Sequence, residues 1–216
     1  MKNLLYKELR LALQAPAVLF LILSAMLIIP NYPYYVTFFY TALGIFFCCQ
    51  LGRENNDVYY TLSLPVRKRD AVTARFLLAV LLEAAQAVIA IPFALLRQSF
   101  AGLGGNAVGM DANIALFGLS LVMLGLFNLC FFPAYYRDPR KVGIPFVKGS
   151  AAILVFIIAA EICAHAVPLF RDRLDTMHGA FLTEKLVVLA IGLVLWALLT
   201  FLAWKISVRR FEKLDL

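Results

Sequence analysis

The sequence predicts an all-α, multi-pass membrane protein: one transmembrane domain over residues 1–216, with six membrane-spanning helices and both termini in the cytoplasm. Two observations lead to this fold class. The chain is 63% hydrophobic and only 15% charged, which is more apolar side chain than a soluble domain of 216 residues can bury. Its apolar residues also gather into long runs, so the bilayer is the expected solvent.

Six apolar runs are candidates for membrane spans, because a helix needs about 20 residues to cross the hydrocarbon core. In chain order they are Ala15–Pro30, Tyr34–Leu51, Ala71–Leu95, Ile114–Phe132, Ser150–Val167 and Leu186–Trp204. The first is short unless flanking residues join it. Residues 30–33, which include two prolines, are all that links the first two runs, so we expect a tight helical hairpin at the membrane interface.

The lysines and arginines set the orientation of these spans. Of the 20 basic residues, 16 fall on one side, in the N-terminal segment, the 52–70 and 133–149 links, the C-terminal segment and at Arg75. The four on the other side are Arg97, Arg171, Arg173 and Lys185. Because basic residues favour the cytoplasmic side, both termini are expected there. The same asymmetry accounts for the net charge of +7 without a nucleic-acid partner.

Met1–Gln14 is predicted to be a separate elbow helix. Its leucines alternate with charged residues, a pattern typical of a helix that lies in the membrane interface. Pro16 then provides a bend into the first span. The alternative is a simple cytoplasmic extension of that span.

Glu54–Leu64 is predicted to be a short helix that lies along the cytoplasmic surface. Val58, Tyr59 and Leu62 share one helical face, at spacings of three and four. Residues 55–57 offer capping side chains, and Pro65 ends the helix. Its tyrosines and acids would face the cytoplasm, where exposed aromatic residues often anchor a partner. The alternative is a basic loop that merely happens to be helical.

Three stretches together resemble the small six-helix permeases of the ABC-2 family, the membrane subunits of ATP-binding-cassette exporters. MKNLLYKELRLALQAP resembles the family's elbow, and ISVRRFEKLDL resembles its closing segment. Between them, ENNDVYYTLSLPVRKRDAVTARF is similar to the family's short coupling helix and the start of the next span. With six spans, the resemblance covers nearly the whole chain, and it is closest to permeases linked with export of peptides such as modulins and lantibiotics.

This resemblance implies a homodimer in a bacterial cytoplasmic membrane, in which each copy meets a separate cytoplasmic ATPase subunit. The substrate would be an amphipathic or cationic peptide, toxin or drug-like molecule. ATP and Mg would sit on the ATPase, because the permease sequence has no Gly-x-x-x-x-Gly-Lys loop and is expected to bind no cofactor of its own. The residues expected to contact the ATPase are Glu54, Asp57, Tyr59, Tyr60 and Leu62.

Ionisable residues within the spans are candidates for a substrate pathway, because charge is costly at bilayer depth. Glu83 and Glu161 lie 12 and 11 residues beyond the starts of their apolar runs, which predicts a similar depth near the middle of the bilayer. His165 shares a helical face with Glu161. The alternative for each carboxyl is a hydrogen bond to a neighbouring helix. Arg75 lies near the cytoplasmic edge and is expected to extend toward water.

Two other classes of function stay open at this point. A membrane scaffold or sensor would use the same loop to recruit a cytoplasmic partner. An intramembrane hydrolase would use Glu161 and His165, but zinc needs about three protein ligands, and the other histidine, His178, falls in an outer link. No catalytic or metal site is expected, and all four cysteines lie within apolar runs. The outer link 98–113, with Gly102, Gly104, Gly105 and Gly109, is expected to be flexible, and 168–184 to form a short interfacial helix.

Overall fold

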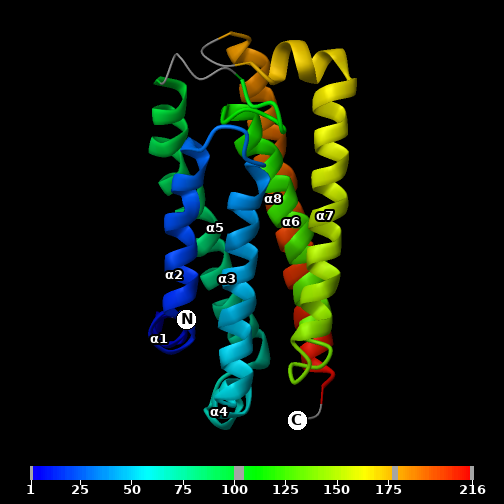
Figure 1. Cartoon of the computed structure of the whole chain (residues 1–216). Coiled ribbons are helices and arrows are strands. Elements are labelled where there is room, and N and C mark those ends of the chain that lie inside the picture. Colours follow the sequence, from blue (N-terminus) through cyan, green and yellow to red (C-terminus); the bar gives the residue numbers. More distant parts are fainter. Residues whose placement is uncertain (1, 100–104, 177–179, 215–216) are drawn as a thin grey trace.

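The computed structural model describes residues 2–99, 105–176 and 180–214, which form a bundle of long helices lying side by side (Figure 1). The elements in chain order are α1 (Lys2–Lys7), the π-helix η1 (Glu8–Ala12), α2 (Ala15–Ile22), the 3-10 helix η2 (Leu23–Ile28), α3 (Tyr35–Glu54), α4 (Asp57–Ser63), α5 (Lys68–Ser99), α6 (Ile114–Tyr135), α7 (Gly143–Ala166), the π-helix η3 (Phe170–Leu174) and α8 (Leu182–Glu212). No strand occurs among the described residues, so the predicted all-α class is confirmed.

Within the described part of the chain, five helices are long and apolar enough to cross a membrane: α3, α5, α6, α7 and α8. The sixth candidate is the bent pair in which residues 2–12 meet residues 15–28 at an angle of 82°. Pro16 lies in the first turn of α2, directly after this bend. The first predicted span is therefore the short one, and the predicted elbow precedes it.

The helices extend beyond the apolar runs that predicted them. α7 begins at Gly143, seven residues before the predicted start at Ser150, and α8 continues to Glu212. With a rise of about 1.5 Å per residue, helices of 31 or 32 residues exceed the ~30 Å hydrocarbon core. Polar side chains such as Lys148 end an apolar run without ending the backbone hydrogen bonds of the helix.

Both termini lie at the same end of the bundle as α4 (Figure 1). The link between α6 and α7 reaches this end too. The structure thus gathers at one end the segments that carry most of the basic residues, and this is the end predicted to be cytoplasmic.

α6 is the central helix, and α7 and α8 both pack against it. Its contact with α8 is backbone to backbone, because glycines face one another at the crossing. A Cβ added to Gly118 would lie 2.7 Å from the carbonyl oxygen of Val188, and one added to Gly192 would overlap the carbonyl of Gly118. Close approach of this kind is typical of helix pairs in membranes, which associate through small residues.

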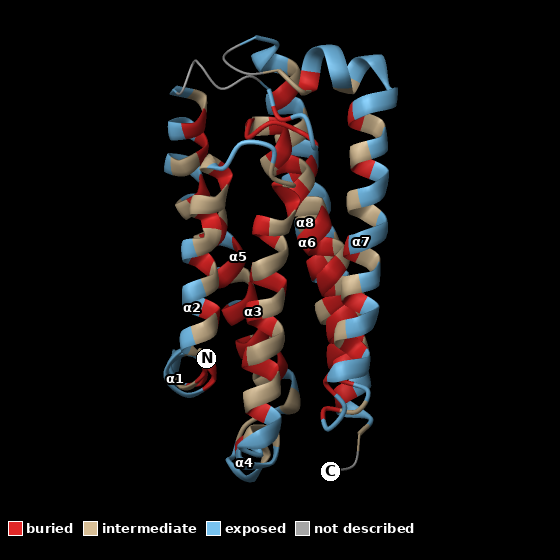
Figure 2. Cartoon of the chain, in the orientation of Figure 1, coloured by how far each residue is buried: buried red, intermediate tan, exposed pale blue. Residues whose placement is uncertain are grey.

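Apolar side chains cover much of the outer surface, as a bilayer-embedded protein requires. Figure 2 shows buried residues where helices face one another and exposed residues along the outer side of α7. Val147 and Val155 on that side are 66% and 68% exposed. The elbow also exposes Tyr6, Leu9 and Leu11, in keeping with a helix that lies in the membrane interface.

Candidate functional site

The candidate site is built around α4, at the end of the bundle that holds both termini. α3 ends at Glu54, and Asn56 adopts a left-handed conformation with φ of 51°, which turns the chain sharply into α4. Asparagine tolerates this conformation better than most residues. Leu64 is extended and Pro65 follows it, so α4 stops after two turns. The predicted short helix is therefore present, but it begins at Asp57 rather than at Glu54.

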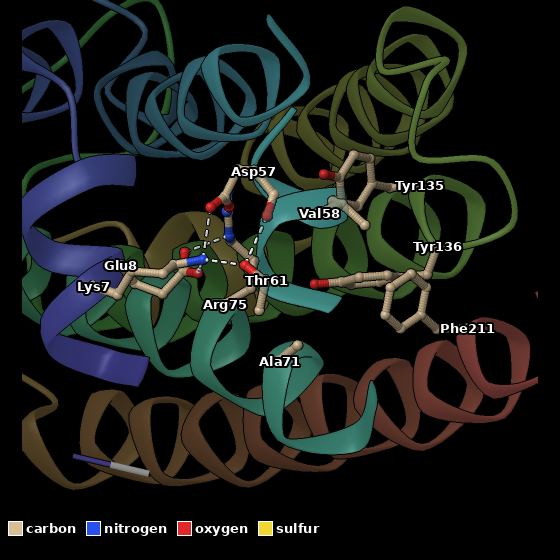
Figure 3. A pocket seen from close by; sticks show the side chains of 10 residues that line it. All are labelled: Lys7, Glu8, Asp57, Val58, Thr61, Ala71, Arg75, Tyr135, Tyr136 and Phe211. Atoms are coloured by element: carbon tan, nitrogen blue, oxygen red, sulfur yellow. Dashed lines mark hydrogen bonds and ion pairs between the residues drawn. The ribbon is translucent and has the colours of Figure 1, made fainter. Parts of the chain in front are cut away.

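Four charged side chains form a closed ring behind α4 (Figure 3). The Asp57 carboxylate lies 2.7 Å from Lys7 Nζ and 2.6 Å from Arg75 Nη2. Glu8 closes the ring, with one oxygen 3.0 Å from Lys7 Nζ and the other 2.6 Å from Arg75 Nε. Cations and anions alternate, and no side chain of the four is more than 13% exposed. We call these four residues the charge ring.

The charge ring connects three elements that are distant in sequence. Lys7 and Glu8 come from the elbow, Asp57 from the first turn of α4, and Arg75 from the predicted cytoplasmic end of α5. Lys7 also donates a hydrogen bond of 2.7 Å to Thr61, one turn further along α4. Any displacement of α4 must therefore move the elbow and α5, or break buried ion pairs.

The space beside the ring cannot hold a substrate. Its volume is about 20 Å³, and its lining includes Tyr135, Tyr136 and Phe211. That is room for roughly one water molecule. The ring therefore links three elements through ion pairs and leaves no space of substrate size beside it.

The other face of α4 points away from the bundle. Tyr59 and Tyr60 are 42% and 57% exposed. Tyr59 also lines a depression of about 190 Å³, together with Arg53, Pro139 and Arg140. This surface combines aromatic rings with arginine, the residue types that most often dominate protein–protein binding energy. We call the exposed residues Tyr59, Tyr60 and Arg140 the outer face.

Residues 3–212 match the family described as ABC-2 family transporter protein. The chain belongs to the ABC-2 transporter family. No curated protein and no solved structure matches it. The chain is a multi-pass transport permease, and permeases of this family work with an ABC ATPase partner at a membrane.

The structure divides the five residues predicted to contact an ATPase into two groups. Glu54, Tyr59 and Tyr60 are exposed, although Glu54 is bonded to Gln50 and lies 3.6 Å from Arg53. Asp57 instead points inward as part of the charge ring, and Leu62 packs against the hydrophobic core. A short helix has one face toward the bundle and one toward water. The sequence alone does not say on which face a given apolar or charged residue lies.

Sequence reasoning missed the charge ring and the contribution of the α6–α7 link. Arg75 was expected to extend toward water, but only 4% of it is exposed, and it also donates to the Cys48 carbonyl oxygen at 3.1 Å. The signal that could have revealed this is Glu8. An acid on an interfacial helix and an arginine at the edge of a nearby span are candidates to pair.

Within the permease, Glu83 is held by hydrogen bonds between helices. Asn128 of α6 and Trp196 of α8 donate to its two carboxylate oxygens at 2.9 and 2.7 Å. Asn128 also donates to Thr200, so three helices are joined at this point, as expected for a polar residue within a span. Glu83 is fully buried, and the neighbouring apolar groove between α5 and α8 is lined by Trp196 and Thr200 rather than by its carboxylate.

Glu161 does not share the depth of Glu83. It lies five residues before the end of α7, close to the end opposite α4, because α7 starts earlier than its apolar run. Its carboxylate packs against Gly109, and His165 is exposed one turn further on. The structure therefore places the two carboxyls at different depths, in contrast to the similar depth that the sequence predicts.

No cluster of three or more potential metal ligands occurs among the described residues. His178 lies outside the described residues. The geometry of the described part thus offers no observation that favours the hydrolase alternative.

The outer links pack against one another in the permease. Asn106 donates to the Tyr32 carbonyl at 2.9 Å, and the Asp111 amide donates to the Asp175 carboxylate at 2.7 Å. Asn113 caps α6 and also donates to the Leu174 carbonyl. Burial raises the pKa of both Asp111 and Asp175. Residues 105–113 are therefore held in place rather than flexible, while Gly102 and Gly104 lie outside the described residues. A short helix is present within 168–184, as η3, and its place at the interface stays a prediction.

Proposed function

We propose that this permease is the membrane subunit of an ATP-driven exporter in a bacterial cytoplasmic membrane, and that α4 is the helix through which a separate ATPase subunit drives it. One observation carries the proposal: α4 has two faces with different roles. Tyr59 and Tyr60 are available to a partner, and Asp57 and Thr61 are bonded to the elbow.

The chemistry of each face suits its role. Exposed tyrosines provide large contact areas at low conformational-entropy cost, and Arg140 adds a cation beside them. Ion pairs that are buried and mutually satisfied resist separation, because removing one partner leaves an uncompensated charge. A force applied to the tyrosines would therefore reach α5 and the elbow through Arg75, Lys7 and Glu8.

The assembly and the substrate belong to the same proposal. The permease works as a homodimer with two ATPase subunits, which hold ATP and Mg. The substrate class carried over from the resemblance is an amphipathic or cationic peptide, toxin or drug-like molecule. Glu161 and His165, near the end opposite α4, are our candidates for the exit side of its path, whereas Glu83 is enclosed in this conformation.

Co-purification tests the docking face. The permease is co-expressed with candidate cytoplasmic ABC ATPases, and the Tyr59→Ala/Tyr60→Ala variant is compared with Tyr6→Ala. Tyr6 is the matched control, since it is 62% exposed but belongs to the elbow. We expect the double variant to retain less than about a tenth of the bound ATPase, because truncating central aromatic anchors typically costs 2 kcal/mol or more, and Tyr6→Ala to retain nearly all of it.

Equal binding by all three proteins would remove α4 from the docking site. Specific binding of an ATPase without transport in reconstituted vesicles would favour the scaffold alternative instead. ATP hydrolysis measured in lipid distinguishes a productive complex from a passive one.

A further inference from the structure

A second cavity lies beside the α6–α7 link, at the same end of the bundle but away from the charge ring. It has a volume of about 520 Å³. Four segments meet around it: the end of α6, the link itself, the first turns of α7 and the last turns of α8. Its lining residues are Ala134, Arg137, Asp138, Lys141, Ile144, Pro145, Lys148 and Arg210. We call it the basic pocket.

The basic pocket carries an excess of positive charge. Arg137, Lys141, Lys148 and Arg210 face a single acid, Asp138. That acid is already engaged, with its oxygens 3.0 Å from Arg140 Nε and 3.7 Å from Lys141 Nζ. The hydrogen bond from Arg140 also lowers the pKa of Asp138, so this acid is ionised and contributes one negative charge to the lining. The net charge of the lining favours an anion.

Arg210 is hydrogen-bonded to the end of α6. Its Nη1 donates a 2.6 Å hydrogen bond to the carbonyl oxygen of Pro133, near the end of α6. The pocket also adjoins the N-terminal turn of α7, a 24-residue helix, through Ile144 and Pro145. The positive end of the helix dipole at such a terminus attracts negative charge. Three elements therefore place positive charge or potential at the pocket: the α6–α7 link, the N-terminal turn of α7 and the last turns of α8.

Exposed apolar side chains of α7 lie next to the pocket. Ile144 and Val147 are 59% and 66% exposed, and the exposed strip continues up α7 through Leu154 and Ile158. Lys148 lies one turn beyond Ile144, about 7.5 Å along the helix from Gly143. An anion held by the basic side chains would thus sit where the polar end of the bundle meets its lipid-facing surface.

We propose that the basic pocket binds the headgroup of an anionic phospholipid, with the phosphate between Arg137, Lys148 and Arg210 and an acyl chain along the exposed strip of α7. A phosphate suits this lining because arginine can hold it through two parallel hydrogen bonds. Basic pockets between membrane helices commonly recognise such headgroups. If these basic residues only set the orientation of the permease in the membrane, neither the cavity nor the neighbouring apolar side chains would be needed.

Titration with short-chain phosphatidylglycerol in a neutral detergent tests the proposal. We expect saturable binding to the whole permease that weakens as salt is raised, no saturable binding of short-chain phosphatidylcholine, and none of glycerol 3-phosphate. The variant Arg137→Gln/Lys148→Gln should bind the anionic lipid at least about tenfold more weakly. The matched control, Arg10→Gln/Arg67→Gln, removes the same charge from exposed residues at the same end of the bundle and should change binding less than about twofold.

Three results would overturn the proposal. Equal weakening in both double variants would show that net charge alone attracts the lipid. Binding of glycerol 3-phosphate as tight as that of the lipid would make the pocket a site for free phosphate compounds. Absence of saturable lipid binding to the unaltered permease would show that the pocket is not a lipid site. This measurement uses no variant, so it tests the proposal even if a variant fails to fold.

Discussion

Replacing Arg75 with alanine should lower the free energy of unfolding by about 3–5 kcal/mol, because it leaves Glu8 and Asp57 buried beside each other without a matching cation. The two acids would then face only Lys7. We expect the elbow and α4 to lose their fixed positions together, and transport in reconstituted vesicles to fall more than ATPase binding does. Unfolding in detergent and transport in vesicles measure the two effects.

The control for this variant is Arg67→Ala, which removes an exposed arginine from the link just before α5 and should change stability by less than about 0.5 kcal/mol. A double-mutant cycle between Glu8→Gln and Arg75→Met isolates their coupling. Additive effects of the two substitutions would mean that the ring does not act as a unit.

Replacing Gly192 should separate α6 from α8. A Cβ at this position would overlap the backbone carbonyl of Gly118, and a rigid backbone cannot give way as a flexible side chain can. We expect Gly192→Ala to destabilise the permease by about 1–3 kcal/mol and Gly192→Leu by more. The denaturation midpoint and the yield of monodisperse protein measure this.

Gly143→Ala is the matched control, since a Cβ at Gly143 would meet nothing within 4 Å. It should be neutral or slightly stabilising, given the better helix propensity of alanine. Equal destabilisation by the two alanine substitutions would contradict the close α6–α8 contact.

The hydrophobic pattern was sufficient to predict the helices, because apolar length and the distribution of basic residues reflect the bilayer directly. The hydrophobic pattern did not predict where the helices begin and end. α7 begins seven residues before its apolar run, and this displaced the predicted depth of Glu161. Helical hydrogen bonding continues into polar sequence, so composition does not mark where a helix stops.

The sequence predicted where the candidate site lies along the chain, but not which of its side chains face the bundle. Proline, asparagine and helical spacing predicted a short helix near residues 54–64, and α4 is there. Whether Asp57 meets the solvent or the bundle depends on Lys7 and Arg75, which are 50 and 18 residues away. Pairings over such distances follow from tertiary packing, which single-sequence periodicity does not contain.

Photo-crosslinking tests the central claim, that the exposed tyrosines of α4 meet the ATPase, most directly. A photo-reactive benzoylphenylalanine is placed at position 60, or at position 6 as a control, and membranes containing the assembled exporter are irradiated. The account predicts a covalent adduct between the permease and the ATPase from position 60 and none from position 6. An ATPase that co-purifies with the permease yet forms no adduct from position 60 would contradict it.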